Sequence, residues 1–146
     1  MKQKAIDKIT IFKPEKSNIT IRPIVNEDIA AGFPSPAEDF KEIRISLDKE
    51  LINNEDATFY ARVRGNSMID ANIEDGDLLV IDKSIEARDG KVAVCMIDGE
   101  FTVKRIKMGE DCLYLMPENK SYEPIKVTNS NEFIVWGIVT YVIKKL

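Results

Sequence analysis

Apolar and polar residues alternate with a period of two from Thr58 onward. In the first such segment, Phe59, Ala61 and Val63 are separated by polar or amphipathic neighbours. This period places alternate side chains on opposite faces and is typical of a half-buried β-strand. Similar alternating or apolar segments follow at short intervals. We expect strands over Thr58–Arg64, Leu78–Ile81, Val92–Ile97, Phe101–Ile106, Leu113–Met116 and Phe133–Ile143.

The turns between these segments are short and chemically specific. Asp98-Gly99 separates two apolar segments and predicts a tight hairpin, because both central residues of a type I′ turn need a positive φ. Short strands with close turns favour an antiparallel architecture. The fold class we predict is mainly β, with a compact, partly closed antiparallel sheet as its core.

The N-terminal quarter has a different pattern. Residues 1–37 are interrupted by Pro14, Pro23 and the segment Gly32–Pro36, and proline removes a backbone donor and fixes φ. We expect an extended N-terminal arm over 1–37, with a short strand near Ile19 and Ile21, and a β-rich core over 38–146.

A weak helical pattern occupies residues 38–53. Its apolar positions are Phe40, Ile43, Leu47, Leu51 and Ile52. Ser46 is a residue type that caps helix N-termini, so we expect a short helix over Leu47–Asn53 capped by Ser46.

The length of 146 residues is typical of one domain, and histidine is absent. The lack of histidine excludes Ser-His-Asp and Cys-His catalysis, histidine-ligated metals and histidine pH switches. The two cysteines, Cys95 and Cys112, lie beside apolar residues and are expected to be small core side chains. We therefore expect neither a metal nor a cofactor.

Charge and hydropathy limit the location and partners. The 21 basic and 25 acidic residues give a net charge of −4, which lacks the basic footprint of a duplex-binding protein. No segment has the apolar core of a signal peptide or the ~18 apolar residues of a membrane span. We expect a cytoplasmic protein that binds neither a membrane nor a specific DNA sequence.

Without histidine, acid–base chemistry near neutral pH must use a tuned Lys, Glu, Asp, Tyr or Cys. One such arrangement is a nucleophilic serine beside a lysine in apolar surroundings. Ser67 follows an alternating segment and lies in Arg64-Gly65-Asn66-Ser67-Met68, where Gly65 permits a sharp bend. Such a bend can present the hydroxyl and backbone N–H groups together. The local pattern alone favours a serine that caps the turn Met68–Ala71.

Lys104 is the candidate base. It shares one face of its predicted strand with Thr102 and Ile106, although a strand lysine is often only solvated edge protection. At an ordinary pKa of ~10.4, roughly 0.04% of lysine is neutral at pH 7. Lowering the pKa to ~7–8 takes roughly 3–5 kcal/mol, which burial can supply. A catalytic Lys104 thus requires a dry pocket without a carboxylate partner.

Taken together, these segments resemble the self-cleaving serine peptidases of the LexA/UmuD family. The resemblance covers about residues 31–145, and the separation of 37 residues between Ser67 and Lys104 matches the family's spacing. Only 31 residues precede Gly32, which favours the UmuD branch over the LexA repressors and their N-terminal DNA-binding domain. The matching segments are Phe33–Ala37, Gly65–Asp70, Asp75–Leu79, Asp98–Lys104 and Trp136–Val139, with the closing Lys144-Lys145.

The resemblance implies roles for individual residues. Ser67 would be the nucleophile, Lys104 the general base, and Ala31-Gly32 the bond that the chain cuts in itself. The small residues Ala31 and Gly32 would let an extended backbone approach the nucleophile closely. The tether would also raise the effective concentration of the substrate.

The resemblance also implies a biological setting. It implies a homodimer whose cleavage is stimulated by the RecA–single-stranded DNA filament in the SOS response to DNA damage. The truncated product would be an accessory subunit of an error-prone Y-family translesion DNA polymerase.

Three alternatives come from other functional classes. A signal peptidase uses the same Ser-Lys chemistry, but it acts at a membrane, and no anchor segment is visible here. A non-proteolytic, repressor-like dimerisation or binding module would not need Ser67 or Lys104. A plain β-domain would not need the matched spacing between them.

Overall fold

The computed structural model of the chain describes residues 8–14, 21–25 and 42–146. The chain divides into two units, one of residues 1–14 with 54–146 and the other of residues 15–53. The expected boundary between arm and core, at residue 37, stays a prediction.

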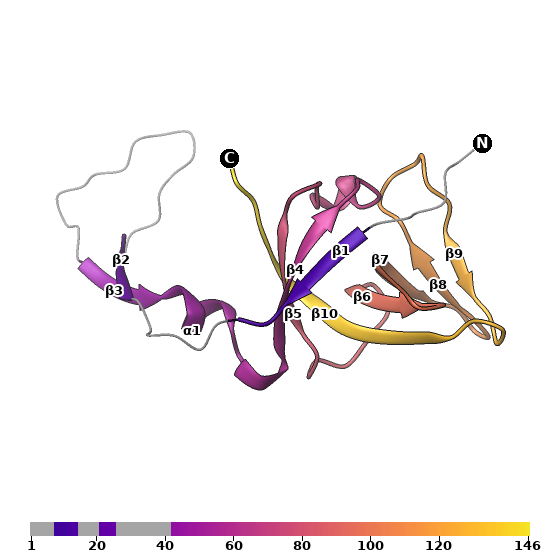
Figure 1. The fold of residues 1–146 in the computed structure, drawn as a ribbon, viewed down its shortest axis with the longest axis horizontal. Coiled ribbons are helices and arrows are strands. Elements are labelled where there is room, and N and C mark those ends of the chain that lie inside the picture. The colour runs from indigo at the N-terminus through magenta and orange to yellow at the C-terminus, as the bar shows by residue number, and fades with distance from the viewer. Residues whose placement is uncertain (1–7, 15–20, 26–41) are drawn as a thin grey trace. The chain divides into compact units, whose positions relative to one another are not determined.

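The larger unit is a curled antiparallel sheet of eight strands (Figure 1). Its curvature brings β1 close to β7 across the open side, so the sheet is a half-barrel. The predicted mainly β fold with a partly closed antiparallel sheet is therefore confirmed. In spatial order the strands are β1 (Lys8–Phe12), β4 (Thr58–Arg64), β5 (Leu78–Asp82), β10 (Phe133–Ile143), β6 (Val92–Ile97), β7 (Glu100–Met108), β8 (Leu113–Met116) and β9 (Ile125–Val127).

Every strand expected from Thr58 onward is present. The β6–β7 hairpin turns at Asp98 and Gly99, whose φ values of 49° and 81° are both positive, as the predicted turn requires. Two single 3₁₀ turns, Glu55–Ala57 and Ile69–Ala71, lie before and after β4. Two of the sheet's strands, β1 and β9, were not predicted.

The smaller unit corrects the expectation of a helical pattern over 38–53. Residues Glu42–Ser46 form β3, which pairs antiparallel with β2 (Ile21–Val25) over five residue pairs. Pairing with a partner strand here outweighs a weak helical periodicity. The short helix is present as α1 (Leu47–Leu51), two residues shorter than expected.

The expected side-chain cap of α1 is wrong. Ser46 occupies the N-cap position in an extended conformation, but its side chain makes no capping hydrogen bond and its buried Oγ has no partner. No helix in the described ranges is long and apolar enough to cross a membrane.

The core of the half-barrel contains two apolar clusters. The first packs between β4, β5, β6 and β7, and it includes Met68 from the turn after β4. The second lies toward β8 and β9 and includes Cys95. The first cluster is Ala61, Val63, Met68, Ile73, Leu79, Ile81, Val94 and Val103; the second is Ala93, Cys95, Ile106, Leu115 and Ile138.

Strand β10 joins the two halves of the sheet. Its first half pairs with β6 and its second half with β5, and the register shifts at Val135/Gly137 and again at Val139/Tyr141. Such irregularities bend a strand and increase its twist. At Gly137 the neighbouring sheet is so close that a Cβ would lie 2.5 Å from Cγ2 of buried Ile81.

We expect Gly137→Ala to lower the free energy of unfolding by about 1–3 kcal/mol, because the added methyl overpacks a rigid core. Urea denaturation measures this change. Gly109→Ala is the matched control, since its Cβ would lie 3.2 Å from the Cys112 carbonyl oxygen in a surface turn. Equal losses for the two variants would contradict the tight packing inferred at Gly137.

Candidate active site

The turn after β4 presents Ser67. Gly65 has a φ of 102°, in the left-handed region that favours glycine, and lets the chain bend sharply where β4 ends. The Gly65 N–H donates a hydrogen bond to Asp75 Oδ1 at 2.8 Å. The 3₁₀ turn that follows has Met68, not Ser67, at its N-cap position. Ser67 itself is 1% exposed.

Lys104 lies in the middle of β7 and is completely buried. In the β6–β7 ladder it stands opposite Ala93, one of the core residues. Its Nζ donates hydrogen bonds to Thr102 Oγ1 at 2.7 Å and to the Val103 carbonyl oxygen at 2.8 Å. The long side chain is thus folded back onto its own strand and held by neutral oxygen atoms.

The two candidate residues meet inside the half-barrel. Lys104 Nζ and Ser67 Oγ are hydrogen-bonded at 3.0 Å, although the residues are 37 positions apart in the sequence. This distance lies within the range needed for proton transfer between a nucleophile and its base. The geometry can therefore support activation of a hydroxyl by an amine.

A buried thiol lies near this pair. Cys95 on β6 stands opposite Thr102 on β7, and burial raises its pKa to about 12, while the protonated form of Lys104 would act in the opposite direction. A thiol with this pKa is neutral at physiological pH and a poor nucleophile. Cys95 and Cys112 are both free, so no disulfide joins them.

A loop from the far end of the sheet braces the residue before Ser67. Asn119 Nδ2 donates to the Asn66 carbonyl oxygen at 2.8 Å, and Tyr122 Oη donates to Asn66 Oδ1 at 2.7 Å. The Asp70 N–H, on the other side of Ser67, donates to the Glu118 carbonyl oxygen at 2.8 Å. The β8–β9 loop therefore holds the serine turn at both ends.

Sequence reasoning missed Asn119 and Tyr122. They lie 53 and 56 residues from Asn66, in a polar loop whose local pattern indicates only a turn. To predict these two contacts from the sequence, one would need to know that the β8–β9 loop lies against the turn after β4. Hydrophobic periodicity contains no such information.

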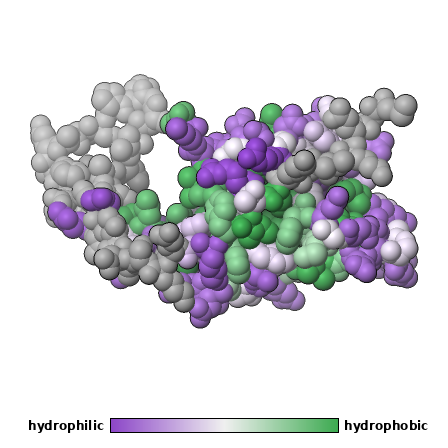
Figure 2. All heavy atoms as spheres, viewed as in Figure 1, coloured by the Kyte–Doolittle hydropathy of each residue, from purple (hydrophilic) through white to green (hydrophobic). Residues whose placement is uncertain are grey.

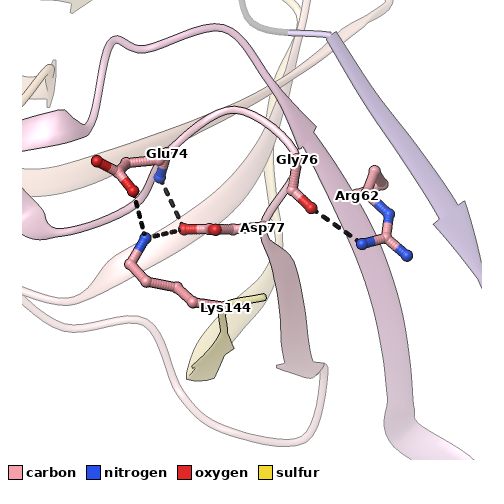
Figure 3. A network of polar contacts seen from close by, with 5 residues as sticks. All are labelled: Arg62, Glu74, Gly76, Asp77 and Lys144. Atoms are coloured by element: carbon pink, nitrogen blue, oxygen red, sulfur yellow. Dashed lines mark hydrogen bonds and ion pairs between the residues drawn. The ribbon is translucent and has the colours of Figure 1, made fainter. Parts of the chain in front are cut away.

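A second network of polar contacts fixes the turn Glu74–Asp77, just before β5 (Figure 3). Asp75 in this turn accepts the hydrogen bond from the Gly65 N–H. Lys144, just after β10, forms ion pairs with Asp77 and with Glu74, the latter at 3.2 Å. Asp77 Oδ2 also accepts from the Glu74 N–H at 2.8 Å, and Arg62 donates to the Gly76 carbonyl oxygen at 2.9 Å. Lys144, near the C-terminus of the chain, thus anchors the turn Glu74–Asp77, which carries Asp75.

Two of the predicted site residues cannot be placed. Ala31 and Gly32, the expected scissile pair, lie outside the described residues. Within the described ranges, no group of three or more Cys, Asp or Glu side chains is arranged to hold a metal ion.

Comparison with known proteins gives a family match over most of the chain. Residues 23–140 match the family model described as Peptidase S24-like. MucA from Salmonella typhimurium is 38% identical over 137 residues, covering 92% of both chains. ImpA from Escherichia coli is 36% identical over 140 residues, covering 90% of both.

A longer relative is matched over a smaller share of its length. LexA repressor 1 from Xanthomonas axonopodis pv. citri is 37% identical over 117 residues, which are 80% of this chain and 58% of the repressor. The similarity thus extends over nearly all of MucA and ImpA, and over part of the repressor.

We expect Lys144→Met to destabilise the fold in a pH-dependent way. The hydrogen bond to Asp77 raises the pKa of Lys144 above its ordinary 10.5; partial burial opposes this effect and Glu74 adds to it. A raised pKa contributes stability that is fully present below pH 10.5 and is lost as the pH rises through the higher folded-state value.

Urea denaturation at a series of pH values tests this expectation. Wild type should exceed Lys144→Met by a constant amount from pH 7 to pH 10, and the difference should shrink in more alkaline solution. Lys145→Met, one residue away and exposed, is the control. A difference that grows with pH would contradict the assigned ion pairs.

Proposed function

This chain belongs to the Peptidase S24-like family and is of the UmuD type, and on that basis we propose that it is a serine peptidase that cuts its own chain. In this proposal Ser67 is the nucleophile, Lys104 is the general base and Ala31–Gly32 is the scissile bond. The observation that carries the proposal is the 3.0 Å hydrogen bond between the buried Lys104 Nζ and Ser67 Oγ.

The proposed reaction has two halves. Neutral Lys104 takes the proton of Ser67 Oγ as this oxygen attacks the Ala31 carbonyl carbon, and the Ser67 N–H stabilises the oxyanion. Protonated Lys104 then gives its proton to the Gly32 nitrogen as the peptide bond breaks. Water, deprotonated by Lys104, hydrolyses the acyl-enzyme and releases residues 1–31 from a core that begins at Gly32.

The surroundings of Lys104 support a neutral amine. Burial disfavours the charged form of a lysine, because the ammonium group loses its hydration. The oxygen atoms that accept hydrogen bonds from Nζ are uncharged. A neutral amine has two N–H donors and one lone pair, and the Thr102 hydroxyl and the Val103 carbonyl oxygen accept the two donors. In the structure Nζ donates to Ser67 Oγ at 3.0 Å; in the neutral state that the mechanism requires, this hydrogen bond reverses, and the Ser67 hydroxyl donates to the lone pair of Nζ.

The wider role is proposed from the family. Similarity to UmuD-type proteins over nine-tenths of the chain supports a role in SOS mutagenesis. We propose a cytoplasmic homodimer that cuts itself when stimulated by the RecA–single-stranded DNA filament. The truncated product would then be an accessory subunit of an error-prone Y-family translesion polymerase.

We expect Ser67→Ala and Lys104→Met each to slow self-cleavage by at least about 10³-fold, because either change removes the nucleophile or its base. Intact mass after incubation at alkaline pH, or with activated RecA filament, reports the loss of residues 1–31. Ser130→Ala and Lys107→Met, an exposed serine and an exposed lysine of β7, are the matched controls.

Thermal unfolding of each variant shows whether the fold survives, which matters most for the buried Lys104. A folded Ser67→Ala chain that still loses residues 1–31 would contradict the proposed nucleophile. A folded wild-type chain that is never cut, even with the filament, would favour the non-proteolytic binding module.

We also expect the intrinsic cleavage rate to rise with pH, about tenfold per unit, until Lys104 is neutral in most molecules. Single-turnover rates between pH 6 and pH 10 measure this profile. Lys144 stays protonated over that range, because its pKa is raised above 10.5, so its ion pairs persist. A profile that stays flat over the whole range from pH 6 to pH 10, or a rate that falls as the pH rises, would contradict lysine as the base.

A further inference from the structure

Strand β1 is an integral part of the core sheet. It pairs antiparallel with β4 over five residue pairs, from Lys8 opposite Arg64 to Phe12 opposite Tyr60 (Figure 1). Ile9 and Ile11 stand opposite Val63 and Ala61 and pack against the first apolar cluster. The strand thus covers both the backbone edge of β4 and a part of the core.

The end of β1 is anchored as well. Lys13 Nζ donates to the Asp56 carbonyl oxygen at 2.7 Å and lies 4.1 Å from the centre of the Phe59 ring. Figure 2 shows hydrophobic residues gathered in the middle of the face over which β1 runs in Figure 1, with hydrophilic residues around them. Removal of β1 would uncover the part of the first apolar cluster against which Ile9 and Ile11 pack.

The proposed cut lies on the C-terminal side of this strand. This inference rests on the proposed function, because only cleavage at Ala31–Gly32 separates β1 from the core. Before the cut, the tether holds β1 at an effective concentration in the millimolar range. After the cut, the covalent tether is lost, and the fragment of residues 1–31 is held only by non-covalent contacts, namely the pairing of β1 with β4 and of β2 with β3.

An edge strand without a neighbour presents a row of unpaired N–H and C=O groups and accepts an added strand readily. We propose that self-cleavage turns the β4 edge into a docking site for an extended strand of a partner protein. That strand would have apolar residues facing Ala61 and Val63, and acidic residues opposite Arg62 and Arg64.

The preference for acidic residues follows from the register. The side chains of Arg62 and Arg64 are exposed on β4, and β1 places Thr10 and Lys8 opposite them. Neither residue has the negative charge that would complement an arginine. Opposite charges directly across a strand pair stabilise it, by up to about fivefold in affinity for each pair. A strand of alternating acidic and apolar residues should therefore bind the edge more tightly than β1 does as a free peptide.

The test uses the full chain with Ser67→Ala and a recognition sequence for a site-specific protease inserted between Ala31 and Gly32. The added protease then makes the cut whether or not the chain cleaves itself, so failure here is distinct from failure of the proposed function. Full-length chain with Ile9→Asp and Ile11→Asp gives a second route, because buried carboxylates should detach β1 without any cut.

The probe is a fluorescent peptide with the sequence of residues 8–13 in which Lys8 and Thr10 are replaced by glutamate. Fluorescence anisotropy should show binding to the cut or β1-detached chain and at least tenfold weaker binding to the uncut chain. Arg64→Glu should weaken probe binding about two- to fivefold, whereas Arg88→Glu, an exposed arginine outside the sheet, should not change it.

Three results would overturn the proposal. One is equal binding to cut and uncut chains. Another is equal binding of a probe whose two isoleucines are replaced by serine, which would indicate charge attraction alone. The third is that the probe does not bind to a cut or β1-detached chain whose Trp136 fluorescence shows that it is folded. This outcome includes the case in which a second copy of the chain, or the N-terminal fragment that stays bound after the cut, occupies the β4 edge.

Discussion

The burial of one amine constrains the rest of this structure. Lys104 lies at the centre of an apolar sheet, where an amine without hydrogen bonds would cost several kcal/mol. Thr102, Val103 and Ser67 provide its partners. The first two come from the same strand, but Ser67 comes from the turn after β4. The sheet must therefore curl far enough to bring that turn over β7, and the half-barrel shape and the candidate site depend on the same contact.

The serine turn is held in place by elements from across the sheet. Asp75, in the turn just before β5, accepts a hydrogen bond from the Gly65 N–H. Asn119 and Tyr122, in the β8–β9 loop, donate hydrogen bonds to Asn66. Each of these hydrogen bonds fixes the position of a polar group next to Ser67. A hydroxyl that must lie within hydrogen-bond distance of a buried base needs such support, because a displacement of about 1 Å can cost on the order of 10²-fold in rate.

Strand β1, near the N-terminus, is joined to the core by backbone hydrogen bonds to β4, of the same kind that join the other strands of the sheet. Strand β1 lies on one side of the proposed scissile bond, and the residues that would cut the bond lie on the other. Ile9 and Ile11 pack on the cluster that also contains Met68, the neighbour of Ser67. In the proposed scheme, strand β1 and the catalytic residues thus belong to one packed sheet, and the bond to be cut lies in the chain between them.

The sequence by itself determined the strands from Thr58 onward and the Asp98-Gly99 hairpin, and its resemblance to a known family identified the two residues that meet in the candidate site. Periodicity and turn chemistry act between neighbours in the chain, so they can be read locally. Only the tertiary structure decided that Lys8–Phe12 is a strand of the sheet, that Glu42–Ser46 forms a β-strand rather than part of a helix, and that Asn119 donates a hydrogen bond to Asn66. Those outcomes depend on hydrogen-bonding partners far away in the sequence, and a local pattern contains no information about which distant backbone completes it.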